Sequence, residues 1–228
     1  MARSQVAVED FVAELAALKF ENVFNPYSDT CATSDLPDAA GIRRRNLATV
    51  LQAALETGVD SIWVARDLGY RGGRRTGLAM TDDVHLDAHG ELFNVRGLVR
   101  PTAGPTVAER TATVIWQTLR DIGRPIFLWN VFPLHPHEPT DPMSNRKHTR
   151  AERDASRDFL VWLVDRLAPE KIVAVGRDAQ DAASELGFSA FEVRHPSYGG
   201  QREFVSTLHE RYSVVARAEP DLFGFSHS

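Results

Sequence analysis

The sequence predicts an α/β fold, a three-layer α/β/α sandwich with a central four-stranded parallel sheet. Four short apolar runs, bounded by Gly, Pro and polar residues, have the length and composition of buried strands. Segments with apolar residues at helical spacing separate these runs. Such alternation favours right-handed crossovers and a parallel sheet covered by helices on both faces. Because the 228 residues contain no long linker, internal repeat or low-complexity segment, we expect a single domain over residues 1–228.

The first half of the chain contains two of the predicted helices and one strand. Apolar side chains at helical spacing predict an amphipathic helix over residues 8–19, followed by a turn-rich stretch over residues 25–41. A second helix is expected over residues 42–57, ending at Gly58. Residues 61–65 then form the first buried strand, and a loop rich in Gly and Arg follows it.

The second half repeats strand and helix in regular order. Thr149 and Glu152 form a capping box that opens a helix running to about residue 167, and Gly187 closes a later one. A Pro- and His-rich loop is expected over residues 132–145. The remaining strands are predicted over residues 126–130, 171–175 and 190–194, and the remaining helices over residues 106–122, 178–186 and 204–212.

Composition limits the function classes. The formal net charge of −5 and the pI of about 5.9 argue, at first sight, against a non-specific nucleic-acid binder. Cys31 is the only cysteine, which excludes an internal disulfide and any zinc or iron–sulfur site held by several cysteines. The N-terminal residues lack the pattern of a signal peptide, and no apolar stretch reaches the ~20 residues of a membrane helix. We therefore expect a soluble cytoplasmic protein.

Polar side chains stand at the ends of the predicted strands, where parallel sheets bind their ligands. Asp67 follows the first strand and offers a carboxylate, Asn130 ends the second strand and offers a planar amide, and His195 follows the fourth. Ser197 and the adjacent glycines provide groups that can hold a phosphate. An Asp, an Asn and a His in one crevice predict a site that binds a base and cleaves a bond to it.

Several motifs in this order resemble those of the uracil-DNA glycosylase superfamily. The first is Ala-Arg-Asp-Leu-Gly at residues 65–69, with its loop ending Gly-Leu-Ala-Met-Thr at residues 77–81. The second is His-Pro-Ser at residues 195–197, and Asn130 matches the family's strand-ending Asn. Asn145 and Arg146, followed by Glu152, are similar to an element of some branches. The resemblance covers roughly residues 62–200, and the single cysteine excludes the iron–sulfur branches.

The resemblance implies a monofunctional glycosylase that hydrolyses the N-glycosidic bond of uracil, or a related deaminated base, and so begins base excision repair. The nucleotide is flipped into the pocket. By this resemblance Asp67 stabilises the sugar cation and positions water, His195 donates a hydrogen bond to uracil O2, and Asn130 reads N3–H and O4. Met80 stands where the family often stacks a Phe on the base, and Phe132 or Tyr70 is the alternative. The implied enzyme is a monomer without metal or cofactor.

The resemblance also implies a DNA-binding surface, with departures from the family pattern. Ser197 would contact a phosphate, and the tip formed by Tyr198, Gly199 and Gly200 would fill the space left by the flipped base. Gly69 aligns with the Tyr that rejects thymine, which leaves the preferred base open, and Arg66 replaces a Gln. Arginines in the first motif loop, with further cations at other strand ends, predict a basic rim on an acidic body. Those of the loop are Arg66, Arg71, Arg74 and Arg75; the others are Arg146, Lys147, Arg150, Arg194 and Arg202.

Other interpretations of these residues stay open at this point. His135 and His137, with His148 and Asp141 nearby, have spacings compatible with a metal-dependent hydrolase. A non-catalytic binder of damaged or abasic DNA, or an enzyme trapped covalently through His195, is compatible with the same motifs. The loop arginines are most simply a solvated surface, and Asp67 is compatible with a turn-forming role.

Overall fold

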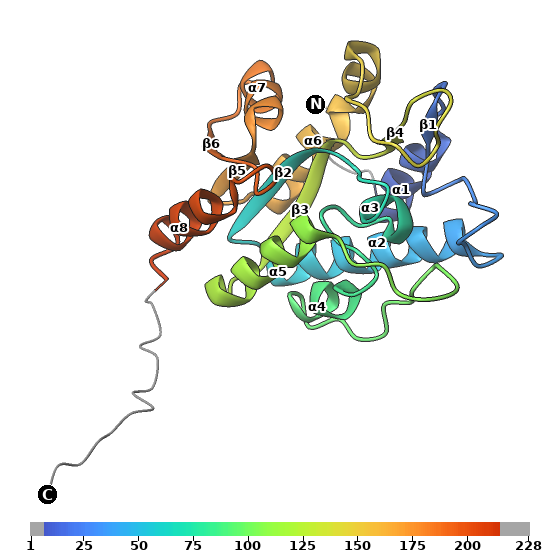
Figure 1. The fold of residues 1–228 in the computed structure, drawn as a ribbon. Helices are drawn as coiled ribbons and strands as arrows, with labels where there is room; N and C mark the ends of the chain where they lie inside the picture. The colour runs from blue at the N-terminus through green and yellow to red at the C-terminus, as the bar shows by residue number, and fades with distance from the viewer. Residues whose placement is uncertain (1–6, 215–228) are drawn as a thin grey trace, which may run out of the picture.

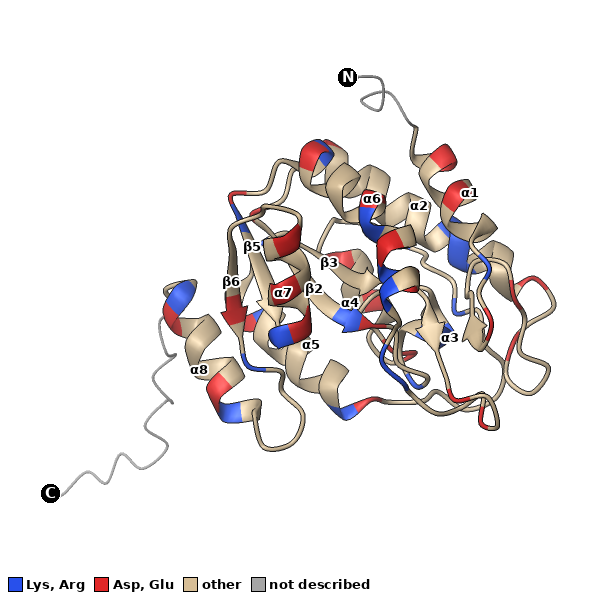
Figure 2. Ribbon diagram, turned by 90° about the horizontal axis from the view of Figure 1, so that it is seen from above, with Lys and Arg blue, Asp and Glu red and all other residues tan. Residues whose placement is uncertain are grey.

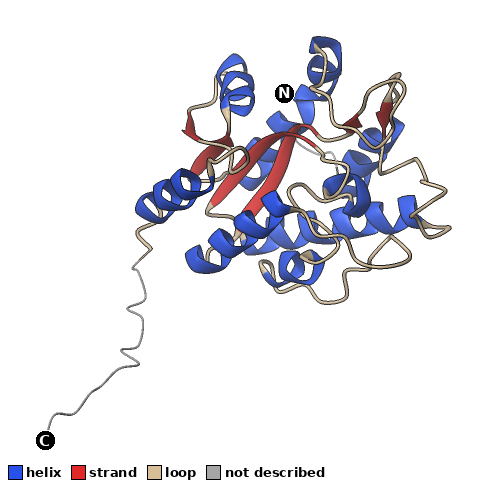
Figure 3. Cartoon of the chain, viewed as in Figure 1, coloured by secondary structure: helices blue, strands red, loops and turns tan. Residues whose placement is uncertain are grey.

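The computed structural model describes residues 7–214 and confirms the predicted fold class. The central sheet is parallel throughout, in the order β3-β2-β5-β6 (Figure 3). Its strands are β2 (Ser61–Asp67), β3 (Ile126–Phe132), β5 (Lys171–Val175) and β6 (Ala190–Val193). In the sheet β2 lies between β3 and β5, and both of these neighbours come later in the chain than β2. The far C-terminal segment, where the sequence places part of its acidic charge, lies outside the described residues.

Helices cover both faces of this sheet, as the alternation of side chains along β2 requires. Ile62 and Val64 pack in the core beneath α1 (Val8–Ala17), α2 (Ala39–Thr57) and α6 (Arg150–Leu167). Trp63 and Ala65 point to the other face and pack with α5 (Arg110–Ile122) and α8 (Gln201–Arg211). The remaining long helix, α7 (Arg177–Glu185), lies with β6 and α8 at the opposite end of the molecule from α1–α3 (Figure 1). Among residues 7–214 no helix is both long and apolar enough to cross a bilayer.

The structure contains four short elements that the sequence did not predict. Strand β1 (Val23–Phe24) pairs with β4 (His135–Pro136) in a two-stranded antiparallel sheet. Of these two strands, β4 lies within the Pro- and His-rich segment that was expected to be a loop. Two short helices, α3 (Gly73–Thr76) and α4 (Leu86–Glu91), lie between β2 and α5. Elements of two to six residues are too short to produce a readable apolar period, which explains why the sequence pattern missed them.

Strands β2 and β3 each run two residues further than expected, which changes how the site is built. Parallel pairing of β2 with β3 places Ala65 beside Asn130 and Asp67 beside Phe132. Asn130 is therefore inside its strand rather than at its end. Side chains two residues apart on a strand share a face, so Asp67 is on the same face as Ala65. Asn130 stands beside Ala65 on the neighbouring strand, and the Asp67 and Asn130 side chains therefore project from the same region of the sheet.

The segment after α1 fixes the loop that follows β2. The Asn25 side-chain amide donates hydrogen bonds to the carbonyls of Leu15 and Leu18 at the end of α1, both at 3.0 Å. The buried Tyr27 hydroxyl donates to the Gly77 carbonyl at 2.7 Å, across fifty residues of chain. Gly77 ends α3 with a φ of +74°, a conformation that favours glycine. The N-terminal segment therefore supports the first motif loop from behind.

Candidate active site

A pocket of about 530 Å³ opens at the carboxyl ends of β2, β3 and β5, where the sequence placed the site. Asp67, Asn130 and His195 all line it, together with Met80, Ser197 and Tyr198 from more distant parts of the chain. Its volume lies within the range of small-molecule and base-binding pockets. The structure therefore brings together the three residues to which the sequence assigned the chemistry.

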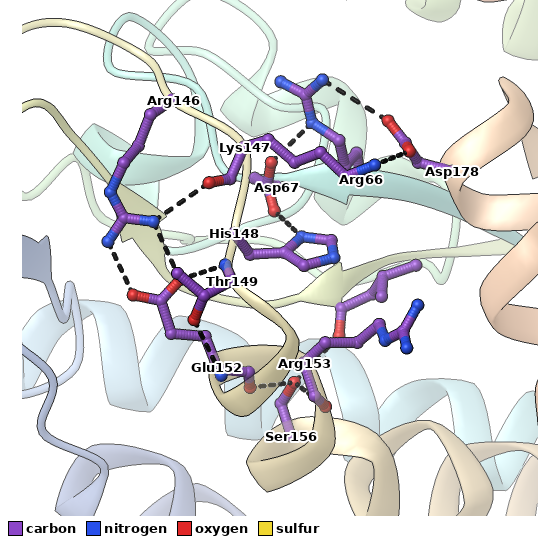
Figure 4. Close-up of polar contacts among 11 residues, drawn as sticks. Arg66, Asp67, Arg146, Lys147, His148, Thr149, Glu152, Arg153, Ser156 and Asp178 are labelled. Carbon is purple, nitrogen blue, oxygen red and sulfur yellow. Dashed lines mark hydrogen bonds and ion pairs between the residues drawn. The ribbon is translucent and has the colours of Figure 1, made fainter.

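Asp67 lies at the end of β2 with its carboxylate held from two sides (Figure 4). One oxygen accepts a hydrogen bond from His148 Nδ1, and the other accepts from Arg66 Nε at 2.6 Å. The Asp67 side chain is only 6% exposed, so these two donors replace most of its contact with water. Each carboxylate oxygen keeps a lone pair for a further donor, such as a water molecule.

His148 belongs to the site, although the sequence analysis considered it only as a metal ligand. It lies in the loop before α6, and its buried ring contacts Asp67. Arg146 and Glu152 fix this loop through two charge-assisted hydrogen bonds of 2.6 and 2.8 Å. The predicted capping box is present as well, with Thr149 and Glu152 bonding each other's backbone N–H. The loop therefore presents the His148 ring to Asp67 in a defined orientation.

Arg66, which bonds to Asp67, also forms an ion pair with a second carboxylate, Asp178 at the start of α7. Arg66 Nη1 lies 3.5 Å from Asp178, and Lys147 forms an ion pair with the same carboxylate. Burial alone would raise the pKa of Asp178, but the hydrogen bond and charge of Lys147, followed by the charge of Arg66, bring that pKa below its ordinary value. Arg66 thus bridges two carboxylates at the mouth of the pocket.

Asn130 lines the pocket with a side-chain oxygen that has no hydrogen-bond partner among the described residues. The residue is 1% exposed, so water does not freely satisfy this oxygen. An unpaired buried acceptor costs about 1–3 kcal/mol, which makes it rare in structural positions. The amide is arranged to accept a hydrogen bond from something that enters the pocket.

His195, in the loop after β6, presents one ring nitrogen to its own loop and leaves the other without a described partner. The backbone N–H of Ser197 donates to His195 Nδ1 at 3.2 Å, so a neutral ring carries its proton on Nε2. Burial, and then the positive charge of Arg66, lower the pKa of His195 below its ordinary value. At neutral pH the ring is therefore a neutral hydrogen-bond donor.

Of the three candidates to stack on a base, only Met80 lines the pocket. Phe132 is fully buried inside β3 and packs against Phe20 and His148, so its assignment to substrate binding is wrong. Tyr70 lies outside the lining, with its backbone N–H donating to the Asn145 side chain at 3.0 Å. Phe132 does not line the pocket because β3 extends through this residue and carries its side chain into the core.

Two of the loop arginines are structural, contrary to the expected DNA contacts. Arg75 is buried and donates two hydrogen bonds to Asp83, at 2.6 and 2.9 Å. Arg74 is buried over the Phe24 ring, with its guanidinium carbon 4.0 Å from the ring centroid. Both lie in α3, whose side chains face the protein interior. Arg71 alone of this group is exposed, with Nε donating to the Tyr70 hydroxyl.

The expected basic rim is in fact a mixture of both charges. Lysines and arginines alternate with acids over the loops and helices around the site (Figure 2). Lys147 pairs with Asp178, and Arg194 pairs with Glu203 at 3.0 Å. The sequence placed only Asp67 against the cations of the first loop, whereas the folded chain adds Asp83 and Asp178.

The loop after His195 forms an exposed tip beside the pocket. Tyr198 is 99% exposed and adopts a φ of +50°, and Gly199 follows with a φ of +81°. Gly200 approaches the chain closely, since a Cβ there would lie 2.2 Å from the His195 carbonyl oxygen. This tight turn explains why the two glycines follow Tyr198.

The histidines considered for a metal site do not form one cluster: the His135 and His137 rings lie 5.9 Å apart, but His148 lies elsewhere. His135 is buried and its Nε2 donates to the Ser144 carbonyl at 2.9 Å, while His148 contacts Asp67. Within residues 7–214, no three side chains of His, Cys, Asp or Glu come together as a metal site requires. The geometry of the described chain therefore gives the metal-dependent hydrolase no ligand set.

Glu109 also lines the pocket, although it was not among the residues predicted for the site. It directly precedes α5, far in sequence from every motif, so no local pattern marked it. The only available signal was an acidic residue at the start of a helix, which ordinarily indicates a favourable interaction with the helix dipole.

Comparison with known proteins adds a family and a fold. The family model of the uracil DNA glycosylase superfamily matches residues 74–219, a range that includes Asn130 and His195 but begins after Asp67. Among solved structures, the crystal structure of wild-type SMUG2 from Pedobacter heparinus matches with a TM-score of 0.60 and 12% identity. That match covers 92% of this chain and 98% of the other. No curated protein sequence matches the chain.

Proposed function

Because the chain belongs to the uracil DNA glycosylase superfamily, we propose that it hydrolyses the N-glycosidic bond of uracil, or of a related deaminated base, in DNA. In this proposal the protein is a monofunctional enzyme that works as a cytoplasmic monomer and begins base excision repair. The substrate nucleotide leaves the duplex and enters the pocket at the end of the sheet.

One observation carries the proposal: the oxygen of the buried Asn130 amide has no partner among residues 7–214 and lies in the same pocket as Asp67 and His195. Uracil presents one N–H donor between two carbonyl oxygens on its exposed edge. An Asn amide accepts from that N–H while its NH₂ group donates to the neighbouring carbonyl. Cytosine has the reversed pattern at these positions and would leave the amide mismatched.

In the reaction, the bond between the sugar carbon and the base nitrogen breaks and its electron pair leaves with the base. His195, neutral and protonated on Nε2, donates a hydrogen bond to the oxygen on which negative charge develops. Asp67 faces the sugar, where its negative charge stabilises the cation and orients water. The water oxygen then bonds to the sugar carbon, and the proton that it loses passes to the departed base or to solvent.

Contacts to DNA come from a few groups in and beside the pocket in this proposal. Tyr198 fills the space from which the nucleotide has moved, Ser197 contacts a flanking phosphate, and Arg71 lies beside the backbone. Because the surrounding rim carries both charges, few phosphates are neutralised and the dependence of affinity on salt is shallow. Most of the binding free energy then comes from the base itself.

A panel of duplexes, each with one modified base, tests the proposal. Wild-type protein is compared with Asp67→Asn, Asn130→Ala and His195→Ala, and the free base is measured by chromatography without added metal. We expect release of uracil or another deaminated base by the wild type and strong loss in all three variants. No release of any base would contradict the proposal. Retention of DNA without release would indicate a damage-binding protein, and a denaturing gel would reveal a covalent adduct through His195.

A further inference from the structure

Glu109 has no structural role that accounts for its carboxyl group. It is the N-cap residue of α5, but its side chain makes no capping hydrogen bond. Instead its backbone N–H donates to Asp82 at 2.6 Å, and its side chain lines the pocket that also holds Asp67, Asn130 and His195. The hydrogen bond from the Glu109 backbone N–H to Asp82 fixes the position of the Glu109 backbone beside the pocket.

Two glycines make room for the Glu109 carboxyl group. A Cβ at Gly69 would lie 3.1 Å from one carboxyl oxygen, and a Cβ at Gly72 would lie 2.3 Å from the other. The second distance is shorter than real contacts of this kind, so a side chain at position 72 would require the end of the flexible Glu109 side chain to move. The carboxyl group therefore lies directly against the loop that follows β2.

The carboxyl group has no hydrogen bond or ion pair with any of the described residues, and Glu109 is partly buried against the pocket. Asn130 in the same pocket has an unpartnered oxygen as well. Polar groups withdrawn from water are nearly always paired, and those at functional sites are paired by the ligand. The pocket is thus lined by a buried amide oxygen and a partly buried carboxyl group, both without a partner among the described residues, and a ligand in the pocket could bond to both.

The surroundings of Glu109 favour its neutral form. Burial raises its pKa, the negative charge of Asp82 raises it further, and Arg71 acts in the opposite direction. Asp82 itself stays ionised, because hydrogen bonds from His85 and from the Glu109 backbone outweigh its burial and lower its pKa. A protonated carboxyl group has an O–H donor, whereas an ionised one only accepts.

We propose that Glu109 is a second base-reading residue, whose protonated carboxyl group donates a hydrogen bond to a carbonyl oxygen of the base in the pocket. The inference rests on the proposed function, because it requires a flipped base. A deaminated base differs from its parent by a carbonyl in place of an amino group. The O–H of a neutral Glu109 therefore matches the deaminated base, and an ionised Glu109 would repel the same oxygen.

Several other ionisable groups face Glu109 and must be separated from it in any pH experiment. Asp82 and His85 lie behind it, and Arg71 lies beside it in the loop after β2. Those across the pocket are Arg66, Asp67, Arg146, Arg177, Asp178 and His195. A Glu109→Gln variant leaves all of these in place and makes only position 109 permanently neutral.

Binding to an uncleavable substrate tests the inference separately from catalysis. The probe is a duplex whose deoxyuridine carries fluorine on the sugar carbon beside the glycosidic carbon, which destabilises the sugar cation and prevents hydrolysis. Its affinity relative to the unmodified duplex is measured by fluorescence anisotropy from mildly acidic to mildly alkaline pH. The proteins are wild type, Glu109→Gln, Glu109→Met, and Glu56→Gln as a matched exposed control on α2.

We expect the wild type and Glu56→Gln to lose roughly threefold to tenfold in preference for the probe as pH rises, which corresponds to one neutral hydrogen bond. Glu109→Gln should keep its preference at every pH, because its NH₂ group donates throughout, and Glu109→Met should lack it throughout. Equal binding by Glu109→Met and wild type, persistence of the pH effect in Glu109→Gln, or no preference in the wild type would each overturn the inference. If the expected pattern appears but no base is released from cleavable DNA, the proposed function fails and the role of Glu109 stands.

Discussion

Asp67 and Glu109 are two carboxyl groups in one pocket with opposite surroundings. Asp67 is held by His148 on one oxygen and by Arg66 on the other. Glu109 lies against two glycines, with no described partner and with the charge of Asp82 behind it. The first arrangement orients the Asp67 carboxylate through two donors, whereas the second raises the pKa of Glu109 and leaves its carboxyl group available to a ligand.

The difference shows that the role of a carboxyl group is set by what its neighbours donate to it. Asp83, close to Asp82 in the chain, completes the comparison. It is buried, and its oxygens accept hydrogen bonds from Arg75, from the Thr102 hydroxyl and from the Val107 backbone. With its bonding capacity used inside the protein, Asp83 has a purely structural role.

The largest effect is expected where the oriented charge is removed. Asp67→Asn should lower the rate of base release on the order of a thousandfold, about 4 kcal/mol, because the sugar cation loses its counter-charge. Single-turnover kinetics on uracil-containing duplex measure this change. Asp181→Asn, an exposed position on α7, is the control and should match the wild type. If Asp67→Asn lowers the rate of base release by less than tenfold, Asp67 is not the residue whose negative charge stabilises the sugar cation.

Removing the partner of the structural carboxylate should affect stability and leave chemistry intact. Arg75→Met should lower the free energy of unfolding by about 3 kcal/mol, because Asp83 is then buried without its cation. Denaturant unfolding measures the change. Arg71→Met, from the same loop but exposed, should unfold like the wild type and bind DNA with a smaller salt dependence. Equal stability of the two variants would contradict the structural role of Arg75.

Loss of the donor to Asp67 should give an intermediate effect. His148→Leu is expected to reduce base release about tenfold to a hundredfold, since the carboxylate loses a charge-assisted bond and its orientation. His148→Asn keeps an N–H at a similar distance from the backbone and should recover part of the activity. His137→Leu, in the preceding loop and without contact to Asp67, is the control. A loss confined to KM would place His148 in binding instead of positioning.

The smallest effect concerns the stability cost of the unpaired carboxyl group. Because the folded pKa of Glu109 is raised, its ionisation opposes folding, and the cost grows as pH rises above the ordinary Glu pKa of about 4.3 towards the folded value. Glu109→Gln should therefore be more stable than the wild type at neutral pH, by less than about 1 kcal/mol, and equally stable in acid. Thermal unfolding across pH tests this, and a destabilised Glu109→Gln would reveal a structural partner.

The fold was predictable because it depends on patterns that are local in the chain. Apolar runs such as residues 171–175, and the capping box of Thr149 and Glu152, specify their elements with little help from distant residues. That Asp67, Asn130 and His195 line one pocket followed from the same reasoning, although Asn130 lies inside β3 rather than at its end. Elements such as β1 and β4 were missed because they exist only through pairing with each other.

The surface and the second layer of the site were not predictable in the same way. Arg74 and Arg75 have the composition of a solvated loop, yet a ring from β1 and a carboxylate beyond α3 draw them into the interior. His148 resembled a metal ligand because only its spacing to other histidines was visible. Its contact with Asp67 joins residues 81 positions apart.

The sequence by itself determined the α/β class, the order of strands and helices, and the three side chains that face the pocket. These follow from periodicity, from capping and from the rule that parallel strands direct their carboxyl ends to one edge. The tertiary structure alone decided which carboxyl group is paired and which is free. Hydrogen-bond donors hold the Asp67 and Asp83 carboxylates, whereas burial and the charge of Asp82 raise the pKa of Glu109. Most of these neighbours come from chain segments remote in sequence.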